Sequence, residues 1–445
     1  ALPTLVPSQP DKEDHSAVRT ASTVTPSTRE EPLPDGSEEE PAEDESETEE
    51  PVSSEEPAPS AKPELVEETL EEIHPEETPA PVDQSQFTPS YGSPYPTAPS
   101  GDYWSTPMDI SNEGAVWDML MRPVTVIEGN PKTQVTLRKE PREDSAGVGI
   151  VTRGTQSVRV ISDTGDGWSL VECYSSSFHD NKVKAWNMLV QGYVKTDTLK
   201  TITPDAGMGL VVDKLSQRLY VFKDGKLFST LQVSTGLSNE RQPYNETRSG
   251  EFLLVSRVGE FQSDALYCSM AIRFNDGDLL HEVPHTKNGD GTKNYRNTEA
   301  KLGDRASHGC IRVQRNKTPE GVNMTWLWKN WRMNTKLVIW EDWQGRQLPY
   351  PDDNTILYYN PDKGTQFHTS AQCQGVVEKH WSKFQSFTYG ELDFGSYKKL
   401  QPCPYCAPPL RKSEIDKINA DHAPGGDHDP VLTKARQKYL DSIKD

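Results

Sequence analysis

Residues 307–313 read Ser307-His308-Gly309-Cys310-Ile311-Arg312-Val313, a polar, glycine-containing run around one cysteine. A cysteine nucleophile needs its thiolate form, a nearby base, and backbone N–H groups directed at a developing oxyanion. Cys310 is the predicted nucleophile, and the amides of Gly309 and Cys310 are candidate oxyanion donors. His308 and Arg312 place positive potential near the sulfur, which is expected to lower the Cys310 pKa. The context therefore predicts a reactive thiol.

The block around this stretch, residues 206–342, contains short strand-forming runs separated by turns. Residues 210–212 are the apolar run Leu210-Val211-Val212, and Asp224-Gly225 supplies the positive φ angles of a tight hairpin turn. Within the block, residues 322–333 have helical spacing. The alternation of short strands and turns predicts a mainly β catalytic domain.

A histidine upstream, at the end of a predicted strand, is the candidate general base. His281 follows two leucines, and His285 lies four residues later. Residues an even number apart on one strand share a face, so His285 is a rival base if the strand continues. His281 is preferred because it matches the motif described next.

The run from His281 to Arg312, with the flanking hairpins, resembles the L,D-transpeptidase (YkuD-type) family over about residues 206–342. The resemblance implies a β-sandwich catalytic domain with Cys310 as nucleophile and His281 as base. His308 and Gly309 complete the implied catalytic turn. Arg312 and Ser307 are the expected substrate-binding residues. Arg312 is expected to orient a carboxylate or brace the loop.

The resemblance also implies the reaction. Cys310 would attack the bond between the third residue of a peptidoglycan stem peptide and D-Ala, and the thioester would pass to an amine of a neighbouring stem, forming a 3–3 cross-link. Two alternatives stay open: a cysteine L,D-carboxypeptidase or endopeptidase, and a non-catalytic cell-wall-binding protein. No cofactor is expected for this chemistry, and the oligomeric state is not indicated.

The interval between His281 and Ser307 is longer than the spacing usual in that family. Residues 286–293 are rich in glycine and polar residues and are expected to form an inserted flexible loop. Such a loop is either a substrate lid or a passive insertion.

The N-terminal region, residues 1–115, is acidic and rich in proline and is predicted to be a disordered stalk. Its first 110 residues hold about 27 acidic and about 4 basic side chains. The whole chain has a net charge of −21, so the remainder is close to neutral. Because no basic stripe offsets the acidic region, a nucleic-acid partner is not expected.

Residues 124–204 contain five short β-prone runs at roughly ten-residue spacing, which predict a small antiparallel barrel or sandwich. Residues 135–138, the Arg153-Gly154-Thr155 turn, Gly167-Trp168 and residues 192–194 together resemble a bacterial SH3 domain. The resemblance implies an SH3-like β-barrel of the kind found in wall-associated proteins. The loop 174–187 is longer than that pattern requires.

Residues 356–406 are predicted to be a small α+β module, followed by a charged segment, 410–445, expected to be a helix and a mobile tail. A small module with a thin core needs a staple. Four residues could bind structural zinc, and a disulfide among the three cysteines is the alternative: His368, Cys373, Cys403 and Cys406. Their order is similar to Ada-type metal-binding modules, although cysteine usually stands where this chain has His368.

The expected location is outside the cell, secreted or attached to the wall. The chain begins Ala1-Leu2-Pro3, which resembles a mature N-terminus left by a signal peptidase. No apolar run in the sequence is long enough to span a bilayer.

Overall fold

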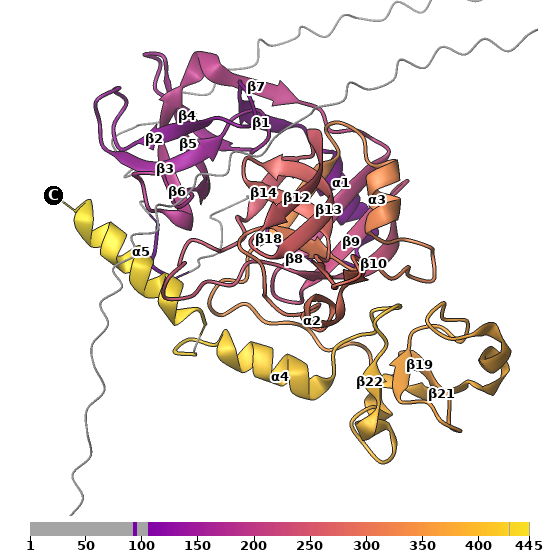
Figure 1. Cartoon of the computed structure of the whole chain (residues 1–445). Coiled ribbons are helices and arrows are strands. Elements are labelled where there is room, and N and C mark those ends of the chain that lie inside the picture. The colour runs from indigo at the N-terminus through magenta and orange to yellow at the C-terminus, as the bar shows by residue number, and fades with distance from the viewer. Residues whose placement is uncertain (1–91, 96–105, 427, 445) are drawn as a thin grey trace, which may run out of the picture. The chain divides into compact units, whose positions relative to one another are not determined.

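The computed structural model describes residues 92–95, 106–426 and 428–444, and it is mainly β, as predicted (Figure 1). Most of the predicted stalk, residues 1–115, lies outside the described residues. The strands form one sheet of nine strands, one of five, one of four and two of two. None of the helices in the described residues is long and apolar enough to cross a membrane.

The nine-stranded sheet holds the block around the candidate nucleophile. Its spatial order is β11-β18-β8-β9-β10-β17-β14-β13-β12, and β18–β8 and β14–β17 are its parallel pairs. The strands are β8 Met208–Asp213, β9 Arg218–Lys223, β10 Lys226–Ser234, β11 Gly250–Leu253, β12 Ser256–Ser263, β13 Leu266–Asn275, β14 Asp278–Glu282, β17 Ile311–Val313 and β18 Lys336–Trp340.

The hairpin predicted at Asp224-Gly225 is present. Lys223 pairs with Lys226, and the two turn residues have φ angles of 52° and 78°. Positive φ at both central residues gives a turn whose twist matches that of the flanking strands. The predicted local signal therefore sets the register of β9 against β10.

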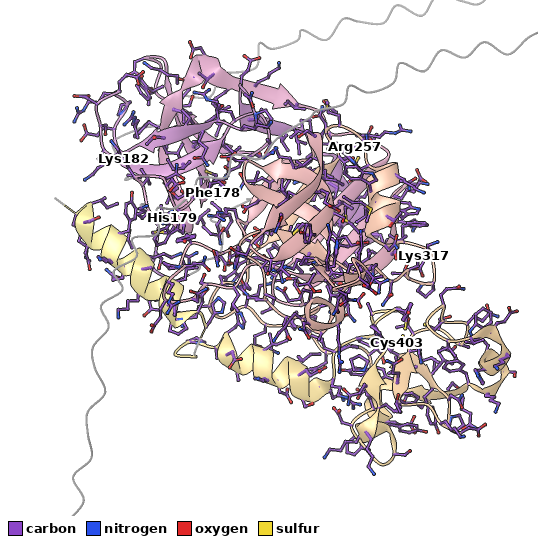
Figure 2. The ribbon with its side chains drawn as sticks, viewed as in Figure 1. Phe178, His179, Lys182, Arg257, Lys317 and Cys403 are labelled. Carbon is purple, nitrogen blue, oxygen red and sulfur yellow. The ribbon has the colours of Figure 1, made fainter. Side chains whose placement is uncertain are left out.

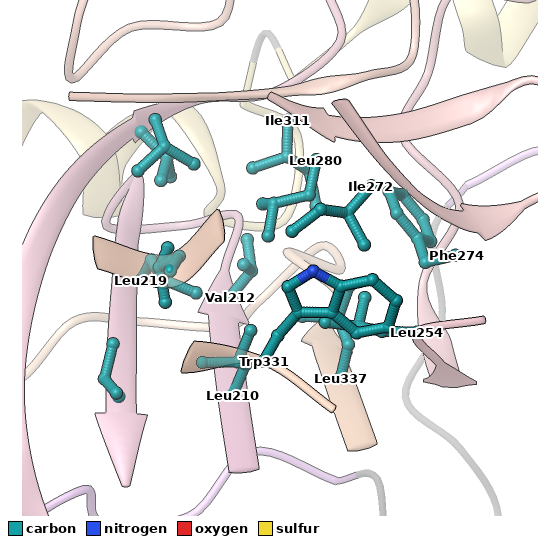
Figure 3. Packing of buried hydrophobic residues seen from close by; sticks show 14 of the residues in the cluster. Leu210, Val212, Leu219, Leu254, Ile272, Phe274, Leu280, Ile311, Trp331 and Leu337 are labelled. Atoms are coloured by element: carbon teal, nitrogen blue, oxygen red, sulfur yellow. The ribbon is translucent and has the colours of Figure 1, made fainter. Parts of the chain in front are cut away.

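One face of this sheet packs on a large apolar core (Figure 3). Leu210, Leu280 and Ile311 come from three strands of the sheet and are fully buried. Helix α3, Met324–Asn330, begins at Asn323, whose side chain accepts a hydrogen bond from the Trp326 N–H at 2.9 Å. Trp331, directly after the helix, fills the centre of the cluster (Figure 3). Burial of such side chains stabilises the sheet by roughly 1.5–3 kcal/mol each.

Helix α1, Glu113–Met121, packs on the opposite face of the same sheet. The Lys336 ammonium donates to the carbonyl oxygens of Met119 at 2.7 Å and Arg122 at 3.2 Å, at the end of the helix. These carbonyls have no partner within the helix, so a buried cation satisfies them well. Helix α1 is therefore part of the same packed unit as the nine-stranded sheet.

The five-stranded sheet lies N-terminal to that block and is antiparallel, with the order β3-β2-β6-β5-β4. Its strands are β2 Gln134–Arg138, β3 Gly147–Thr152, β4 Arg159–Asp163, β5 Trp168–Ser176 and β6 Trp186–Lys195. A two-stranded ribbon of β1, Val124–Ile127, and β7, Leu199–Ile202, accompanies it. The short strands match the expected pattern, and the SH3-like assignment stays a prediction.

The C-terminal sheet has the order β21-β19-β20-β22, built from Ile356–Tyr359 (β19), Gln366–His368 (β20), Gln385–Thr388 (β21) and Gln401–Pro402 (β22). Its apolar cluster contains six fully buried residues, among them Leu357, Phe367 and Tyr389. A core this small agrees with the expectation that the module needs an additional staple.

The charged C-terminal segment is not a mobile tail. It forms α4, Lys412–Asp421, and α5, Pro430–Ser442. Tyr439 of α5 belongs to the apolar cluster of the five-stranded sheet, and its hydroxyl donates to the Gly147 carbonyl at 2.9 Å. Because α5 is rich in charged residues, its apolar contact could not be predicted from the sequence. The sequence analysis therefore predicted a mobile tail.

Candidate active site and metal centre

Cys310 directly precedes β17, on a turn that several hydrogen bonds hold. Ser307 Oγ donates to the Cys310 carbonyl and accepts the Gly309 N–H at 3.2 Å. Thr247 Oγ1 donates to the Gly309 carbonyl at 2.8 Å. Gly309 has φ 122°, and a Cβ there would lie 2.5 Å from Asp278 Oδ1. Only glycine fits this position without displacing its neighbours.

This turn changes the predicted oxyanion site. The Gly309 amide already donates to Ser307 Oγ, so the Cys310 amide is the remaining candidate of the two. Ser307 is 2% exposed, and both of its hydroxyl contacts lie inside the turn. The structure thus places Ser307 as a residue that shapes the turn, in contrast to the expected substrate contact.

The Cys310 thiol is half-buried, and its Sγ lies 3.9 Å from the Gly277 carbonyl oxygen. Burial raises the pKa of Cys310 to about 12, and the Asp278 carboxylate adds to the rise. The Leu279 N–H and the Arg312 guanidinium oppose these effects but are weaker. The expected lowering of the Cys310 pKa is therefore wrong, because the sequence did not reveal the carboxylate packed against the turn.

His281 lies on β14, the strand paired in parallel with β17, and its Cα is the register partner of Arg312. Cys310 is two residues before Arg312, so Cys310 and His281 share one face of the paired strands. The Arg312 guanidinium acts on the pKa values of both residues. The register thus places the predicted nucleophile and the predicted base on the same face of two paired strands, two residues apart along the strand direction.

The protonation of His281 suits a general base. Its Nδ1 lies 2.6 Å from the Glu282 carbonyl oxygen, so Nδ1–H is the donor and Nε2 keeps its lone pair. Burial lowers the His281 pKa to about 4, and Arg312 contributes to the lowering. At neutral pH the site therefore holds a thiol and a neutral imidazole.

The remaining predicted site residues lie at the rim. His308 is exposed next to Cys310, and Arg312 is half-buried on β17. The rival base, His285, packs between the rings of Tyr267 and Tyr295, with centroids at 5.6 and 5.1 Å. This aromatic packing gives His285 a structural role in the fold.

The segment expected to be a flexible loop is folded. It forms a two-stranded ribbon of β15, Thr286–Lys287, and β16, Lys293–Asn294, followed by α2, Arg296–Glu299. The Tyr295 hydroxyl donates to Glu282 Oε1 at 3.0 Å, one residue beyond His281. The insertion is therefore attached to the strand that carries the base.

A buried ion pair below the nucleophile turn escaped the sequence analysis. Arg248 Nη1 lies 3.3 Å from Asp278 Oδ1, and both side chains are almost fully buried. Arg248 Nη1 also donates to the Glu246 carbonyl at 2.9 Å, and its Nη2 donates to the Ser177 carbonyl at 2.5 Å. Ser177 belongs to the N-terminal β module, so the support of the turn is assembled from segments distant in sequence.

The C-terminal module brings together its four predicted ligands, His368, Cys373, Cys403 and Cys406, whose ligand atoms lie within 4.8 Å of one another. The Cys373 and Cys403 sulfurs are 3.7 Å apart, and Cys406 Sγ is 3.9 Å from His368 Nδ1. Tetrahedral zinc with Zn–S bonds of about 2.3 Å places two sulfurs about 3.8 Å apart. Cys403 lies in the C-terminal module in Figure 2.

Backbone amides also surround these sulfurs. The N–H groups of Thr369, Gly375 and Tyr405 each lie 3.4 Å from a sulfur of the set. Such N–H···S contacts favour the thiolate form that a metal requires. Three thiols and one imidazole in this arrangement fit a structural zinc ion.

A second group of possible ligands fits a cation poorly. His422 Nε2 and His428 Nε2 lie 3.3 and 3.8 Å from Asp342 Oδ2. The Asp342 carboxylate already pairs with Arg305, and Lys214 Nζ lies 3.8 Å from it. Two resident cations already offset the negative charge, so this cluster is a buried ion-pair network.

Residues 208–339 match the sequence model of the YkuD family, an L,D-transpeptidase catalytic domain. A curated protein of Bacillus subtilis (strain 168), named "Putative L,D-transpeptidase YciB", is 32% identical to this chain over 133 residues. That alignment covers 29% of this chain and 63% of YciB.

Solved structures also match. A crystal structure of an L,D-transpeptidase from Stackebrandtia nassauensis is 21% identical over 30% of this chain and 56% of its own, with a TM-score of 0.22. An L,D-transpeptidase from Mycobacterium tuberculosis H37Rv is 15% identical over 42% of this chain and 94% of its own, with a TM-score of 0.24.

Proposed function

We propose that this chain, in which residues 208–339 form an L,D-transpeptidase catalytic domain of the YkuD family, forms 3–3 cross-links between peptidoglycan stem peptides. The observation that carries the proposal is the register of β14 and β17. It places a neutral His281, with Nε2 free to accept a proton, on the same face as Cys310. A wall substrate places the protein outside the cytoplasmic membrane, secreted or attached to the wall.

In the proposed reaction, Cys310 Sγ attacks the carbonyl carbon of the third stem residue while His281 Nε2 takes the thiol proton. The Cys310 amide stabilises the oxyanion. The C–N bond to D-Ala breaks, D-Ala leaves with the proton from His281, and a thioester remains. An amine of a neighbouring stem then attacks the thioester carbonyl, forms the new amide bond, and returns a proton to the thiol.

The exposed His308 and the half-buried Arg312 lie at the rim of this site, where Arg312 is proposed to orient a stem carboxylate. The SH3-like module, residues 124–204, is proposed to bind the wall. Zinc is proposed for the C-terminal module, where it would cross-link a small core and take no part in the acyl transfer.

The direct test is mass spectrometry of tetrapeptide-rich peptidoglycan incubated with the protein, with Cys310→Ala and with Cys268→Ala. Cys268 is the matched control because it is a buried thiol on β13 whose pKa burial raises to about 12. New 3–3 dimers with the wild type and Cys268→Ala, but not with Cys310→Ala, are expected.

Other products would change the conclusion. Release of D-Ala without dimers would make the protein a cysteine L,D-carboxypeptidase, with water as the acceptor. No product with folded wild-type protein would contradict the proposal and favour the wall-binding alternative.

A further inference from the structure

We propose that Phe178, in the loop after β5 of the N-terminal β module, forms one wall of the substrate site and contacts the aliphatic part of the acyl-donor stem. This inference rests on the proposed function and adds a specificity-determining residue from outside the catalytic domain. The loop, residues 177–185, lies within the segment 174–187, which is longer than the predicted SH3-like pattern requires.

The loop is attached to the catalytic domain at its base. Ser176 Oγ lies 3.0 Å from Asn275 Oδ1, at the end of β13. The next residue, Ser177, accepts the hydrogen bond from Arg248 Nη2. Because Arg248 also pairs with Asp278, the loop and the nucleophile turn share one buried support.

In space, a single residue, Gly277, links Phe178 to the nucleophile Cys310. Its Cε1 lies 3.6 Å from the position that a Cβ on Gly277 would occupy. The Gly277 carbonyl oxygen, in turn, lies 3.9 Å from Cys310 Sγ. A side chain at position 277 would contact the Phe178 ring, and glycine leaves that side of the ring uncovered.

The loop holds the ring in place before any substrate binds. The Phe178 N–H donates to Asn181 Oδ1 at 2.5 Å, and Asn181 Nδ2 donates to Gln134 Oε1 at 2.8 Å. The Arg248 guanidinium stacks over the ring with 4.1 Å between its Cζ and the ring centroid. A preset wall loses little entropy when the substrate binds.

The chemistry of the wall indicates what it contacts. Phe178 is half-buried, so part of its ring remains open, whereas Arg248 is buried and paired and has no charge to offer a ligand. An aromatic surface without a free polar partner suits aliphatic groups. Among the parts of the donor stem near the scissile carbonyl, its aliphatic groups fit this description.

The test compares Phe178→Ala and Phe178→Leu with Asp180→Ala, a control in the same loop whose side chain is 99% exposed. Steady-state kinetics with a tetrapeptide donor give KM and kcat. The rate of Cys310 alkylation by iodoacetamide, with and without tetrapeptide, gives a readout that needs no turnover, and thermal melting reports on folding.

For Phe178→Ala we expect KM for the donor to rise about tenfold, with a similar loss of tetrapeptide protection. Alkylation by iodoacetamide alone should change less than about twofold, because this small reagent does not need the wall. Phe178→Leu should recover most of the protection, and Asp180→Ala should behave as the wild type.

The failures are distinguishable. If the wild type turns over tetrapeptide and is protected, while Phe178→Ala matches it, only this inference is overturned. Phe178→Ala could instead change the alkylation rate without tetrapeptide by about tenfold, or clearly lower the melting temperature. Either result would show that the ring only supports the turn, and the inference is again overturned. A wild type that neither turns over nor is protected overturns the proposed function, and this inference falls with it.

Discussion

At the scale of single residues, the site depends on groups that the motif does not contain. Asp278 packs against Gly309 and raises the Cys310 pKa, and Arg248 neutralises Asp278 from below. The nucleophile and its base were predicted because local sequence carries them. The charge environment was mispredicted because it comes from residues about 30 and 60 positions earlier in the chain.

Gly309→Ala is predicted to lower kcat/KM by more than about 100-fold, because a displaced nucleophile loses its alignment with the substrate carbonyl. The added Cβ would lie 2.5 Å from Asp278 Oδ1 in a backbone conformation with φ 122°. Kinetics with a tetrapeptide donor measure the loss. Gly289→Ala is the matched control, since nothing lies within 4 Å of its Cβ. Equal activity of the two variants would show that the turn tolerates movement.

The neutral state of His281 predicts the acid side of the pH profile. Because the folded pKa is about 4, kcat/KM should be flat from about pH 5 to pH 8 and fall below about pH 4.5. Initial rates in buffers of constant ionic strength measure this limb. A midpoint well above pH 4.5 would contradict the assignment of this limb to His281.

The lowered pKa of His281 also predicts that the free energy of unfolding depends on pH. Between pH 6.5 and pH 4 the unfolded chain binds a proton at residue 281 more readily than the folded chain does. The contribution of the neutral imidazole is therefore fully present above pH 6.5 and declines as the pH falls toward 4. In denaturant titrations, His281→Gln should reduce this pH dependence, and an unchanged slope would contradict the shift.

At the scale of elements, packing across distant segments overrides local composition. Helix α5 is mostly polar, yet Arg436 is 1% exposed. Its Nε donates to the Trp186 carbonyl at 2.8 Å and its Nη2 to the Asn187 carbonyl at 3.0 Å. Charged residues are rarely buried unless paired, so the docking of this helix could not be predicted from its composition. The hairpin at Asp224-Gly225, whose signal is local, was predicted correctly.

Arg436→Met is predicted to lower the free energy of unfolding by about 2 kcal/mol, because two buried carbonyls lose a charged donor. Denaturant unfolding followed by tryptophan fluorescence measures the change. Lys438→Met, on an exposed position of the same helix, is the control and should change stability by less than about 0.5 kcal/mol. If both variants unfold alike, α5 does not stabilise the N-terminal β module.

At the scale of the whole molecule, segments that precede and segments that follow the catalytic domain in the chain both contact it. Ser177 of the N-terminal β module contacts Arg248, and the C-terminal segment reaches Asp342 through His422. The small Cys/His module depends on its own four ligands. These modules are therefore expected to respond differently to removal of metal.

Metal analysis of the purified chain is predicted to find one zinc ion bound by the C-terminal module. The C-terminal module is expected to unfold in a transition of its own. Chelation should lower the melting temperature of that transition, because the small core of the module loses its cross-link. Cys403→Ser should produce the same shift, whereas Cys173→Ser, a buried cysteine outside the set, should not remove zinc. The alkylation rate of Cys310 should remain unchanged on chelation. Two of the three cysteines resisting labelling after chelation, but labelled after reduction, would favour a disulfide.

The sequence by itself determined the mainly β class, the hairpin at Asp224-Gly225, the candidate nucleophile and base, and the four ligand candidates. Those features depend on local turn geometry or on residue chemistry at short spacing. Only the tertiary structure decided the high pKa of Cys310, the docking of α5, and the approach of Phe178 to the nucleophile. Each of these arises from side chains far apart in sequence, whose proximity depends on how separate sheets pack.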